Sequence, residues 1–429
     1  MQDLPVLPSE VPEDGQIAEA IAAEADWMQE ILARLVEKPT VLGNEEPGQA
    51  VMREAIREIG LEPVDVPMDA ATLRAHPLGS PFDWDVEGKA NVVARWATGG
   101  REGGSSLILN GHIDVVSPEP LSQWHRDPFV AHVEEDWLSG RGAADMKCGL
   151  AAILGAVKGL RRAGLHPHAP VTLESVVEEE CTGNGTLQTL LAGYAADAAV
   201  ITEPYGSSIT TSQVGVLWFQ VKIEGIAGHA AGGHGVNAIE ESLRIIDALR
   251  ALEVELNAEP PAPYDAYAHP IGLNVGTIAG GDWPSTVPGE CITGYRIALY
   301  PGMEVRELQA RIEAVVAATA ADDPAAFPLP PEVRYVGFGC EGYAIEPDHA
   351  LVRTLSGAHA RIAGSPPAEI ATTSTTDARV FGQAAGIPAV CFGPYAEGAH
   401  GSGERVYLPS VVQTAQVLGL LIRDWCGLS

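Results

Sequence analysis

Six predicted segments between residues 214 and 342 follow one another in the order strand, helix, strand, strand, helix, strand. This β-α-β-β-α-β order is that of the ferredoxin-like arrangement. On both sides of it, short apolar strands alternate with amphipathic helices, which is typical of a mostly parallel sheet with helices on both faces. We therefore expect an α/β domain made of residues 1–213 and 343–429, with a ferredoxin-like α+β domain inserted over residues 214–342.

The flanking α/β pattern comes from apolar periodicity. Apolar positions at helical spacing predict helices, and short runs of β-branched and aliphatic residues predict strands. Helices are expected at 17–37, 47–59 and 149–164, and strands at 91–96, 106–110, 171–177, 198–202 and 387–393.

The composition limits the classes of function. The chain has 429 residues, more than one hydrophobic core usually holds. Its 57 acidic and 26 basic residues give a net charge of −31, which disfavours binding to nucleic acid or to an anionic membrane. The six cysteines form no CxxC pair, the N-terminus does not resemble a signal peptide, and no apolar run reaches the roughly 18 residues that span a bilayer. We expect a soluble protein of the cytoplasm.

Side chains that can bind metals follow the predicted strands or lie in neighbouring loops. In an open α/β sheet, ligands bind outside the carboxyl ends of the strands. Each candidate alone is a weak signal, but together they predict a metal site where these loops meet. The candidates are His112, Asp145, the run Glu178–Glu180, Glu203 and His400.

The spacing of these residues suits a metal-activated water. A histidine that binds zinc through one ring nitrogen needs the hydrogen on its other nitrogen held by a carboxylate or carbonyl. Asp114 lies two residues after His112 and so on the same side of an extended chain, where it can orient the imidazole. The adjacent glutamates 178–180 repel one another unless cations neutralise them. Two metals and a water nucleophile require one carboxylate as a ligand and a neighbour as general base.

Eight collinear segments carry a family resemblance that covers nearly the whole chain. They make the sequence resemble the M20 family of metallopeptidases and deacylases, which includes acetylornithine deacetylase and succinyl-diaminopimelate desuccinylase. The segments are GHIDVV (111–116), WHRDPF (124–129), GRGAADMKCG (140–149), VVEEECTGNG (176–185), ITEP (201–204), GIAGH (225–229), TTDAR (375–379) and AHGSGE (399–404).

This resemblance implies a catalytic α/β domain that holds two divalent metal ions, with zinc as the first expectation and cobalt or manganese as alternatives. His112 and Glu203 would be terminal ligands of one metal, and Glu180 and His400 of the other. Asp145 would bridge both metals, and Glu179 takes the position of the general base. Cys148 replaces a glycine that is common in the family, and we interpret its thiol as structural.

In the family, the inserted domain pairs with its copy and acts as a lid. The histidine that ends its G-x-x-x-H pattern reaches the active site of the partner. Gly225 to His229 fits this pattern, with His234 as a nearby competitor. The resemblance therefore implies a homodimer in which His229 stabilises the negative carbonyl oxygen of the transition state.

Two arginines compete to bind a substrate carboxylate, which an arginine can hold with two parallel hydrogen bonds. One is Arg379, which with Thr376 and Asp377 belongs to the TTDAR segment. The other is Arg296, in the segment GYRIAL of the inserted domain.

The expected function is metal-dependent hydrolysis of the amide bond in an N-acylated amino acid, with N-acetylornithine as the first expected substrate. Aminopeptidase members of the family usually carry aspartate where this chain has Glu203, which favours a deacylase. A carboxypeptidase or dipeptidase is the alternative within the same chemistry. A non-catalytic metal-binding scaffold is the alternative from another class, and the complete set of ligand candidates argues against it.

Overall fold

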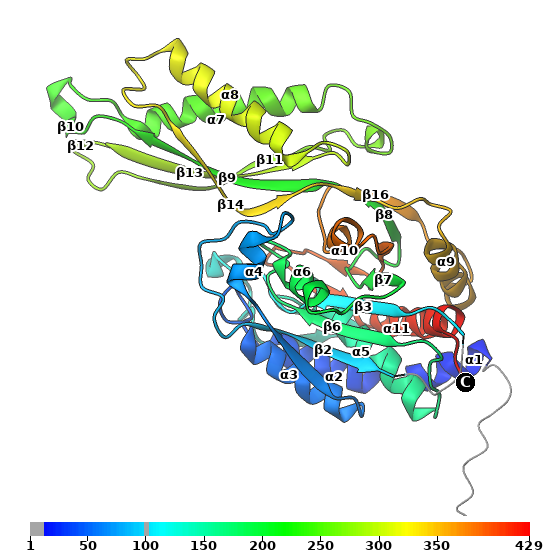
Figure 1. Cartoon of the computed structure of the whole chain (residues 1–429). Coiled ribbons are helices and arrows are strands. Elements are labelled where there is room, and N and C mark those ends of the chain that lie inside the picture. Colours follow the sequence, from blue (N-terminus) through cyan, green and yellow to red (C-terminus); the bar gives the residue numbers. More distant parts are fainter. Residues whose placement is uncertain (1–12, 98–102) are drawn as a thin grey trace, which may run out of the picture.

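The computed structural model describes residues 13–97 and 103–429, which form two units (Figure 1). We call residues 215–340 the inserted unit and the remaining described residues the main unit. A nine-stranded sheet with the order β1-β2-β6-β3-β7-β17-β8-β15 runs through the main unit, and β16 pairs with β8. The strands are β1 (Pro63–Pro67), β2 (Ala90–Trp96), β3 (Leu107–His112), β6 (Val171–Val176), β7 (Ala198–Ile201), β8 (Ile209–Gln213), β15 (Tyr343–Ala344), β16 (Glu369–Thr372) and β17 (Ala389–Cys391).

The centre of this sheet is parallel. β3 pairs in parallel with β6 and with β7, and β17 pairs in parallel with β7. The outer strands β1, β2 and β15 are antiparallel to their neighbours. Parallel pairing places the carboxyl ends of β3, β6 and β7 on the same edge of the sheet. Residues that follow these strands can therefore meet there.

Helices cover both faces of the large sheet (Figure 1). α1 (Asp14–Ala22), α2 (Ala25–Val36), α3 (Glu46–Glu58), α5 (Lys147–Arg162) and α11 (Leu408–Leu421) share one apolar core, against which α9 (Ala350–Ala363) also packs. α4 (Ala70–Ala75), α6 (Asn184–Leu191) and α10 (Ala378–Ala385) lie on the other side. The absence of a side chain at Gly155 lets α5 approach α2, because a Cβ atom there would lie 2.1 Å from Sδ of Met28.

The single helix expected over residues 17–37 is wrong. The structure has two helices, α1 and α2, separated at Ala23 and Glu24. The Glu24 carboxylate is buried and pairs with Lys158 at 3.2 Å and Arg162 at 2.7 Å, both on α5. Apolar periodicity continues across residues 23 and 24, so the break could not be predicted from it.

The inserted unit has the expected order of elements and its own apolar core. Its sheet has the order β11-β13-β9-β14, and every pairing is antiparallel. The two helices cover the face turned away from the main unit (Figure 1). The elements are β9 (Gly215–Glu224), α7 (Ala238–Leu256), β11 (Leu273–Gly280), β13 (Glu290–Leu299), α8 (Val305–Asp322) and β14 (Glu332–Cys340).

Alternation along β9 explains this layering. Leu217, Phe219 and Val221 are buried in the core under the helices, whereas Trp218 and Gln220 are only partly buried on the opposite face. The predicted fold class, an α/β protein with an inserted α+β sheet, is confirmed. The chain leaves the large sheet after β8 and returns at β15. Domain boundaries at 214 and 342 stay a prediction.

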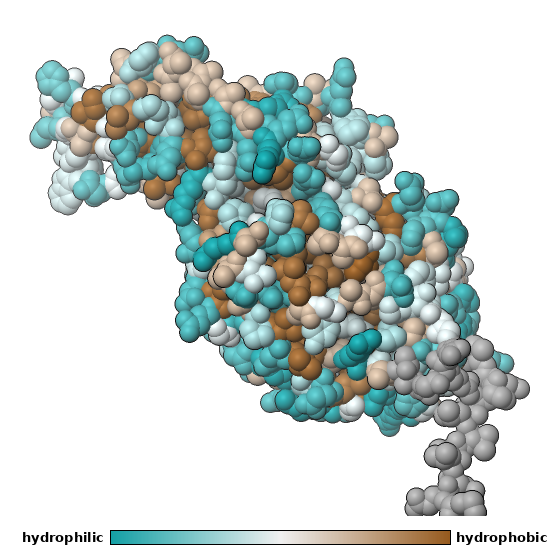
Figure 2. Space-filling view, viewed as in Figure 1, coloured by the Kyte–Doolittle hydropathy of each residue, from teal (hydrophilic) through white to brown (hydrophobic). Residues whose placement is uncertain are grey.

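Two small sheets complete the description. A ribbon of β10 (Gly228–His229) and β12 (Thr286–Val287) lies at the outer end of the inserted unit (Figure 1). In the main unit, β4 (His132–Glu134), β5 (Trp137–Ser139), β18 (Ala396–Glu397) and β19 (Arg405–Tyr407) form a four-stranded sheet. Figure 2 shows the two units as two lobes, with hydrophilic side chains over most of both and apolar ones gathered in the middle of the main unit in this view. Across residues 13–97 and 103–429, no helix combines the length and apolar character needed to cross a membrane.

Candidate active site

The residues singled out after the predicted strands meet at one edge of the large sheet. His112 is the last residue of β3, beside Val176 at the end of β6. Glu203 follows β7, and Asp145 lies two residues before α5. His400 lies in the turn between β18 and β19, with a φ of 63°. We call His112, Asp145, Glu179, Glu180, Glu203 and His400 the acidic edge.

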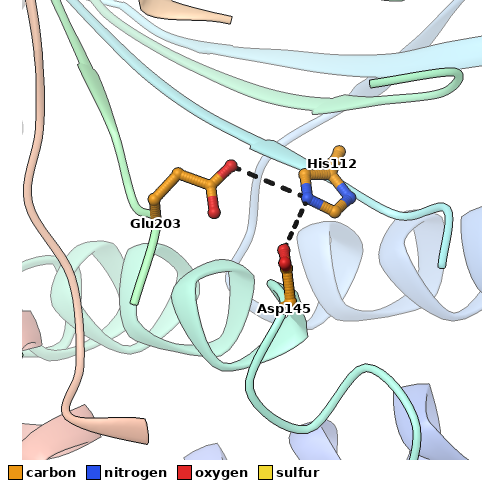
Figure 3. Close-up of side chains that lie close together, drawn as sticks. All are labelled: His112, Asp145 and Glu203. Carbon is orange, nitrogen blue, oxygen red and sulfur yellow. Dashed lines mark hydrogen bonds and ion pairs between the residues drawn. The ribbon is translucent and has the colours of Figure 1, made fainter. Parts of the chain in front are cut away.

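One half of the acidic edge is built from His112, Asp145 and Glu203 (Figure 3). The Nε2 atom of His112 lies 3.0 Å from Oδ1 of Asp145 and 3.6 Å from Oε1 of Glu203. His112 and Glu203 are buried, and the Asp145 side chain is partly exposed. One ligand atom from each of these residues lies within 4.8 Å of the ligand atoms of the other two.

The other half shares Asp145. The Nε2 atom of His400 lies 3.3 Å from Oδ2 of Asp145 and 3.1 Å from Oε2 of Glu180. These three residues also offer ligand atoms within 4.8 Å of one another. Because Asp145 directs one oxygen to each histidine, it occupies the position of a bridge between two cation sites.

Electrostatics tests whether cations fit the acidic edge. Hydrogen bonds to Asp145 and Glu180 raise the pKa of His400 to about 11. Burial opposes charge on His112, yet Asp145, Glu179 and Glu203 raise its pKa well above the ordinary value. Burial also opposes charge on Asp145, but the two histidines hold its pKa below its usual range. Without cations, protons on the two imidazoles compensate the negative charge of the carboxylates. Divalent cations bound at the same place would compensate this charge in their stead. Imidazole and carboxylate groups suit zinc, cobalt or manganese, so the donor set fits two such ions.

Glu179 faces this centre without being part of either group of three. Its Oε2 atom lies 3.9 Å from Nε2 of His112, and its Oε1 atom is buried with no hydrogen-bond partner among the described residues. Burial raises its pKa well above the ordinary value, against the opposing effect of His112. A carboxylate in this state is suited to accept a proton.

Asp114 orients His112 through a different atom from the expected one. The Nδ1 atom of His112 donates to the backbone carbonyl oxygen of Asp114 at 2.8 Å, and the Asp114 carboxylate is 3.7 Å away. That carboxylate accepts the backbone N–H groups of Glu179 at 3.2 Å and Glu180 at 3.0 Å. Asp114 therefore holds the loop that carries both glutamates.

Sequence reasoning missed a buried ion pair between Arg141 and Glu404. The Oε1 atom of Glu404 accepts the backbone N–H groups of Ala144 at 3.0 Å and Asp145 at 3.1 Å. Arg141 also donates to the carbonyl oxygen of His400 at 3.2 Å. The pair thus joins the loop that carries Asp145 to the loop that carries His400. The available signal was that both residues lie in segments that carry the resemblance.

A second buried cation supports the first glutamate of the run. Lys89 lies 2.7 Å from Glu178 and 3.0 Å from Glu45. The indole N–H of Trp84 donates to Glu178 at 2.9 Å. Glu178 therefore anchors the loop, leaving Glu179 and Glu180 for the acidic edge. The Cys148 thiol is buried and donates to the carbonyl oxygen of Ala144 at 3.0 Å, as a structural thiol would.

His229 lies away from the acidic edge. It is exposed on the β10–β12 ribbon, and its Nδ1 atom accepts the backbone N–H of Ala231 at 3.1 Å. His234 is also exposed. Within one chain, neither histidine has a contact with a residue of the acidic edge among the described residues.

The two candidate arginines lie in different surroundings. Arg379 is buried and donates to the carbonyl oxygen of Thr182 at 3.1 Å. Its neighbours Thr376 and Asp377 are also buried, bonded to Gln213 and Thr186 at 2.6 Å each. Arg296 is only partly buried and lines a cavity under the inserted sheet. The geometry favours Arg296 as the contact to substrate and the TTDAR segment as support for the acidic loop.

Comparison with known proteins identifies the family of this chain. The model of peptidase family M20/M25/M40 matches residues 108–424. The chain belongs to this family. It is 32% identical over 376 residues to the N-formyl-4-amino-5-aminomethyl-2-methylpyrimidine deformylase of Halalkalibacterium halodurans, covering 82% of this chain and 87% of that protein. It is 30% identical over 345 residues to the succinyl-diaminopimelate desuccinylase of Paracoccus denitrificans, covering 78% and 86%.

Solved structures of peptidases share the fold. The di-peptidase Dug1p of Saccharomyces cerevisiae superposes with a TM-score of 0.79 at 15% identity, covering 97% of this chain and 99% of that one. A dinuclear metal binding M20 peptidase of Bacillus subtilis superposes with a TM-score of 0.62 at 15% identity, covering 94% and 99%. The predicted family and the enzyme class, an M20 hydrolase, are confirmed.

Proposed function

We propose that this M20 hydrolase removes the acyl group from an N-acylated amino acid, using two divalent metal ions held at the acidic edge. The observation that carries the proposal is the pair of ligand groups that share Asp145, with Glu179 beside them and one of its oxygens unbonded. The curated relatives named above, a deformylase and a desuccinylase, both remove acyl groups, which supports a deacylase over a dipeptidase.

His112, Glu203, Glu180 and His400 would hold the two ions, with Asp145 between them. When bound, the ions would polarise the scissile carbonyl group and lower the pKa of an attacking water. Glu179 takes the proton from this water and later delivers it to the leaving amine. The Arg141–Glu404 pair keeps the loops of Asp145 and His400 in register, and Asp114 does the same for Glu179 and Glu180.

A homodimer would complete this chemistry. The imidazole of His229 is exposed and its Nε2 atom has no hydrogen-bond partner among the described residues, so it is available to a second copy. Placed against the carbonyl oxygen of the substrate, an imidazole N–H stabilises the charge that develops in the transition state.

The six free, buried cysteines agree with the predicted cytoplasmic location.

Hydrolysis of a defined panel tests the proposal. The purified protein, loaded with zinc, cobalt or manganese, is assayed with N-acetyl, N-formyl and N-succinyl amino acids, N-acetylornithine and dipeptides. We expect release of free amine from at least one N-acyl amino acid, abolished by a chelator and restored by metal. Turnover of dipeptides alone would instead make the protein a dipeptidase, and stoichiometric metal binding without any turnover would favour the scaffold.

A further inference from the structure

A cavity of about 370 Å³ lies between the two units, under the open face of the inserted sheet. Small-molecule sites typically occupy about 300–1,000 Å³, so this volume suits part of a substrate. The main unit contributes Asp83 and Trp84 from the loop before β2, and the inserted unit contributes the rest of the lining, including Trp218, Asn274 and Arg296.

Two indole rings form walls of this cavity, and both are fixed. Trp84 donates its N–H to the buried carboxylate of Glu178 at 2.9 Å. The ring of Trp218 meets Phe338 edge to face, with centroids 5.3 Å apart and an angle of 81°. Trp218 also leans on Gly337, where a Cβ atom would lie 2.4 Å from the indole ring. Rings held this way lose little side-chain entropy when a ligand binds.

The positive charge of Arg296 in the cavity has no carboxylate partner among the described residues. Arg296 stands in β13 directly between Asn274 of β11 and Trp218 of β9, so the three side chains form a row across the sheet. Its only hydrogen bond runs to the carbonyl oxygen of Thr373 at 3.4 Å, and no carboxylate of the described chain forms an ion pair with it. Asp83, the acidic residue of the lining, is already paired with Arg334 at 2.7 Å. A partly buried guanidinium with free donors calls for an anionic group on the ligand.

The cavity is close to the acidic edge on two sides. Trp84 contacts Glu178, the neighbour of Glu179 in the chain. Behind Trp218, the guanidinium of Arg379 lies over the Phe338 ring, 5.5 Å from its centroid. Arg379 also donates to the carbonyl oxygen of Thr182, in the loop that follows Glu178–Glu180. Trp84 thus contacts the loop that bears Glu179 directly, and Trp218 is connected to it through Phe338 and Arg379.

We propose that this cavity selects N-acyl amino acids with an aromatic side chain, placing the flat ring between Trp84 and Trp218 and the carboxylate on Arg296. This assignment rests on the proposed function. Aromatic rings pack favourably on indole, edge to face or offset. A cationic side chain such as that of ornithine could also approach an indole face. It would meet the positive charge of Arg296, however, and find no unpaired carboxylate among the described lining residues, so the aromatic class is favoured over N-acetylornithine.

Substrate preference and one substitution test this inference. We expect the wild-type protein to give a higher kcat/KM for N-acetyl-L-phenylalanine and N-acetyl-L-tryptophan than for N-acetyl-L-alanine or N-acetyl-L-ornithine. Trp218→Leu should lower kcat/KM for the aromatic substrates about tenfold, mainly through KM, since an aromatic pair contributes up to about 1.5 kcal/mol. Its kcat/KM for N-acetyl-L-alanine should fall much less, because the methyl side chain makes no aromatic pair with the indole. Trp218→Phe should recover most of the loss.

Trp27→Leu is the matched control, because Trp27 is a partly buried tryptophan of α2 that does not line the cavity. An equal loss for aromatic and small substrates in Trp218→Leu, or a wild-type preference for N-acetyl-L-ornithine, would overturn the inference. If no N-acyl amino acid is hydrolysed, the proposed function fails. Calorimetric titration of N-acetyl-L-phenylalanine into the wild type and Trp218→Leu then still tests the cavity, and equal affinity would contradict its role.

Discussion

The acidic edge and the open face of the inserted sheet differ in how their charged groups are satisfied. At the acidic edge, each imidazole lies within 3.3 Å of an oxygen of Asp145, and backbone N–H groups fix the loops through Asp114 and Glu404. On the inserted unit, Arg296 has no carboxylate partner among the described residues and His229 is exposed. In the main unit the charged groups are therefore already paired with one another around candidate cation ligands, whereas the inserted unit presents charged or polar groups that have no such partners among the described residues.

The largest effect is expected from a substitution at the acidic edge of the main unit. Asp145→Asn removes the negative charge that both ligand groups share, so both metals should be lost together. Activity should then fall further than the roughly 10²–10⁴-fold that loss of a single general base costs. Metal content by mass spectrometry and turnover measure the result, with the exposed Asp26→Asn as the control. Retention of a full metal complement would contradict the bridging position of Asp145.

The next largest effect is expected at His229 on the inserted unit. His229→Ala should keep its metals yet lose activity about 10²–10³-fold, the usual cost of one donor to a developing oxyanion. The exposed His234→Ala should behave like the wild type. Mixing His229→Ala with Glu179→Gln should restore part of the activity, because a mixed dimer regains one complete site. No recovery after demonstrated subunit exchange would count against a site shared between copies.

A smaller effect is expected at the residue that ties the two metal loops together. Glu404→Gln keeps the shape but removes the charge that pairs with Arg141, and Nε2 replaces one of the two carboxylate oxygens. Metal affinity should fall about 10–100-fold, as is usual for groups that support metal ligands, and excess metal should restore much of the activity. Glu397→Gln is the control, because Glu397 at the end of β18 pairs with Arg405 near the surface and, among the described residues, has no hydrogen bond to either metal loop. Unchanged metal affinity would limit the pair to a purely structural role.

These residues show what the sequence can and cannot predict. The five ligand candidates were visible because each follows a strand or lies in a loop at the same sheet edge. Trp84 acts through a tertiary contact with a distant segment, so no local pattern predicts its role. Glu404 lies in a segment that carries the resemblance, but its pairing with Arg141 joins residues far apart in the sequence. The break at Glu24 escaped prediction because apolar periodicity continues across it. The order of elements in the inserted unit was predictable from periodicity, but the cavity beneath its sheet depends on how the two units face each other.

The smallest effect concerns stability, at a buried acid that the chemistry does not use. Burial raises the pKa of Glu174 from 4.5 to about 8. Between these values the folded state binds more protons than the unfolded state, so this group lowers stability as pH rises from about 4.5 to 8. Glu174→Gln, which mimics the neutral acid, should therefore raise Tm relative to the wild type at pH 8 by about 1–3 °C and hardly at pH 5. Thermal unfolding at both pH values measures this, with the exposed Glu37→Gln as the control, and a pH-independent difference would contradict it.

The most direct test of the central claim is the metal content and turnover of Glu179→Gln, measured on the same preparation. If Glu179 accepts the proton of a water activated at a two-metal centre, the variant should bind as much metal as the wild type while kcat falls about 10²–10⁴-fold. Wild-type turnover with the metals in place would contradict the assignment of Glu179 as the base. Loss of the metals themselves would contradict the division between Glu179 and the ligands of the acidic edge.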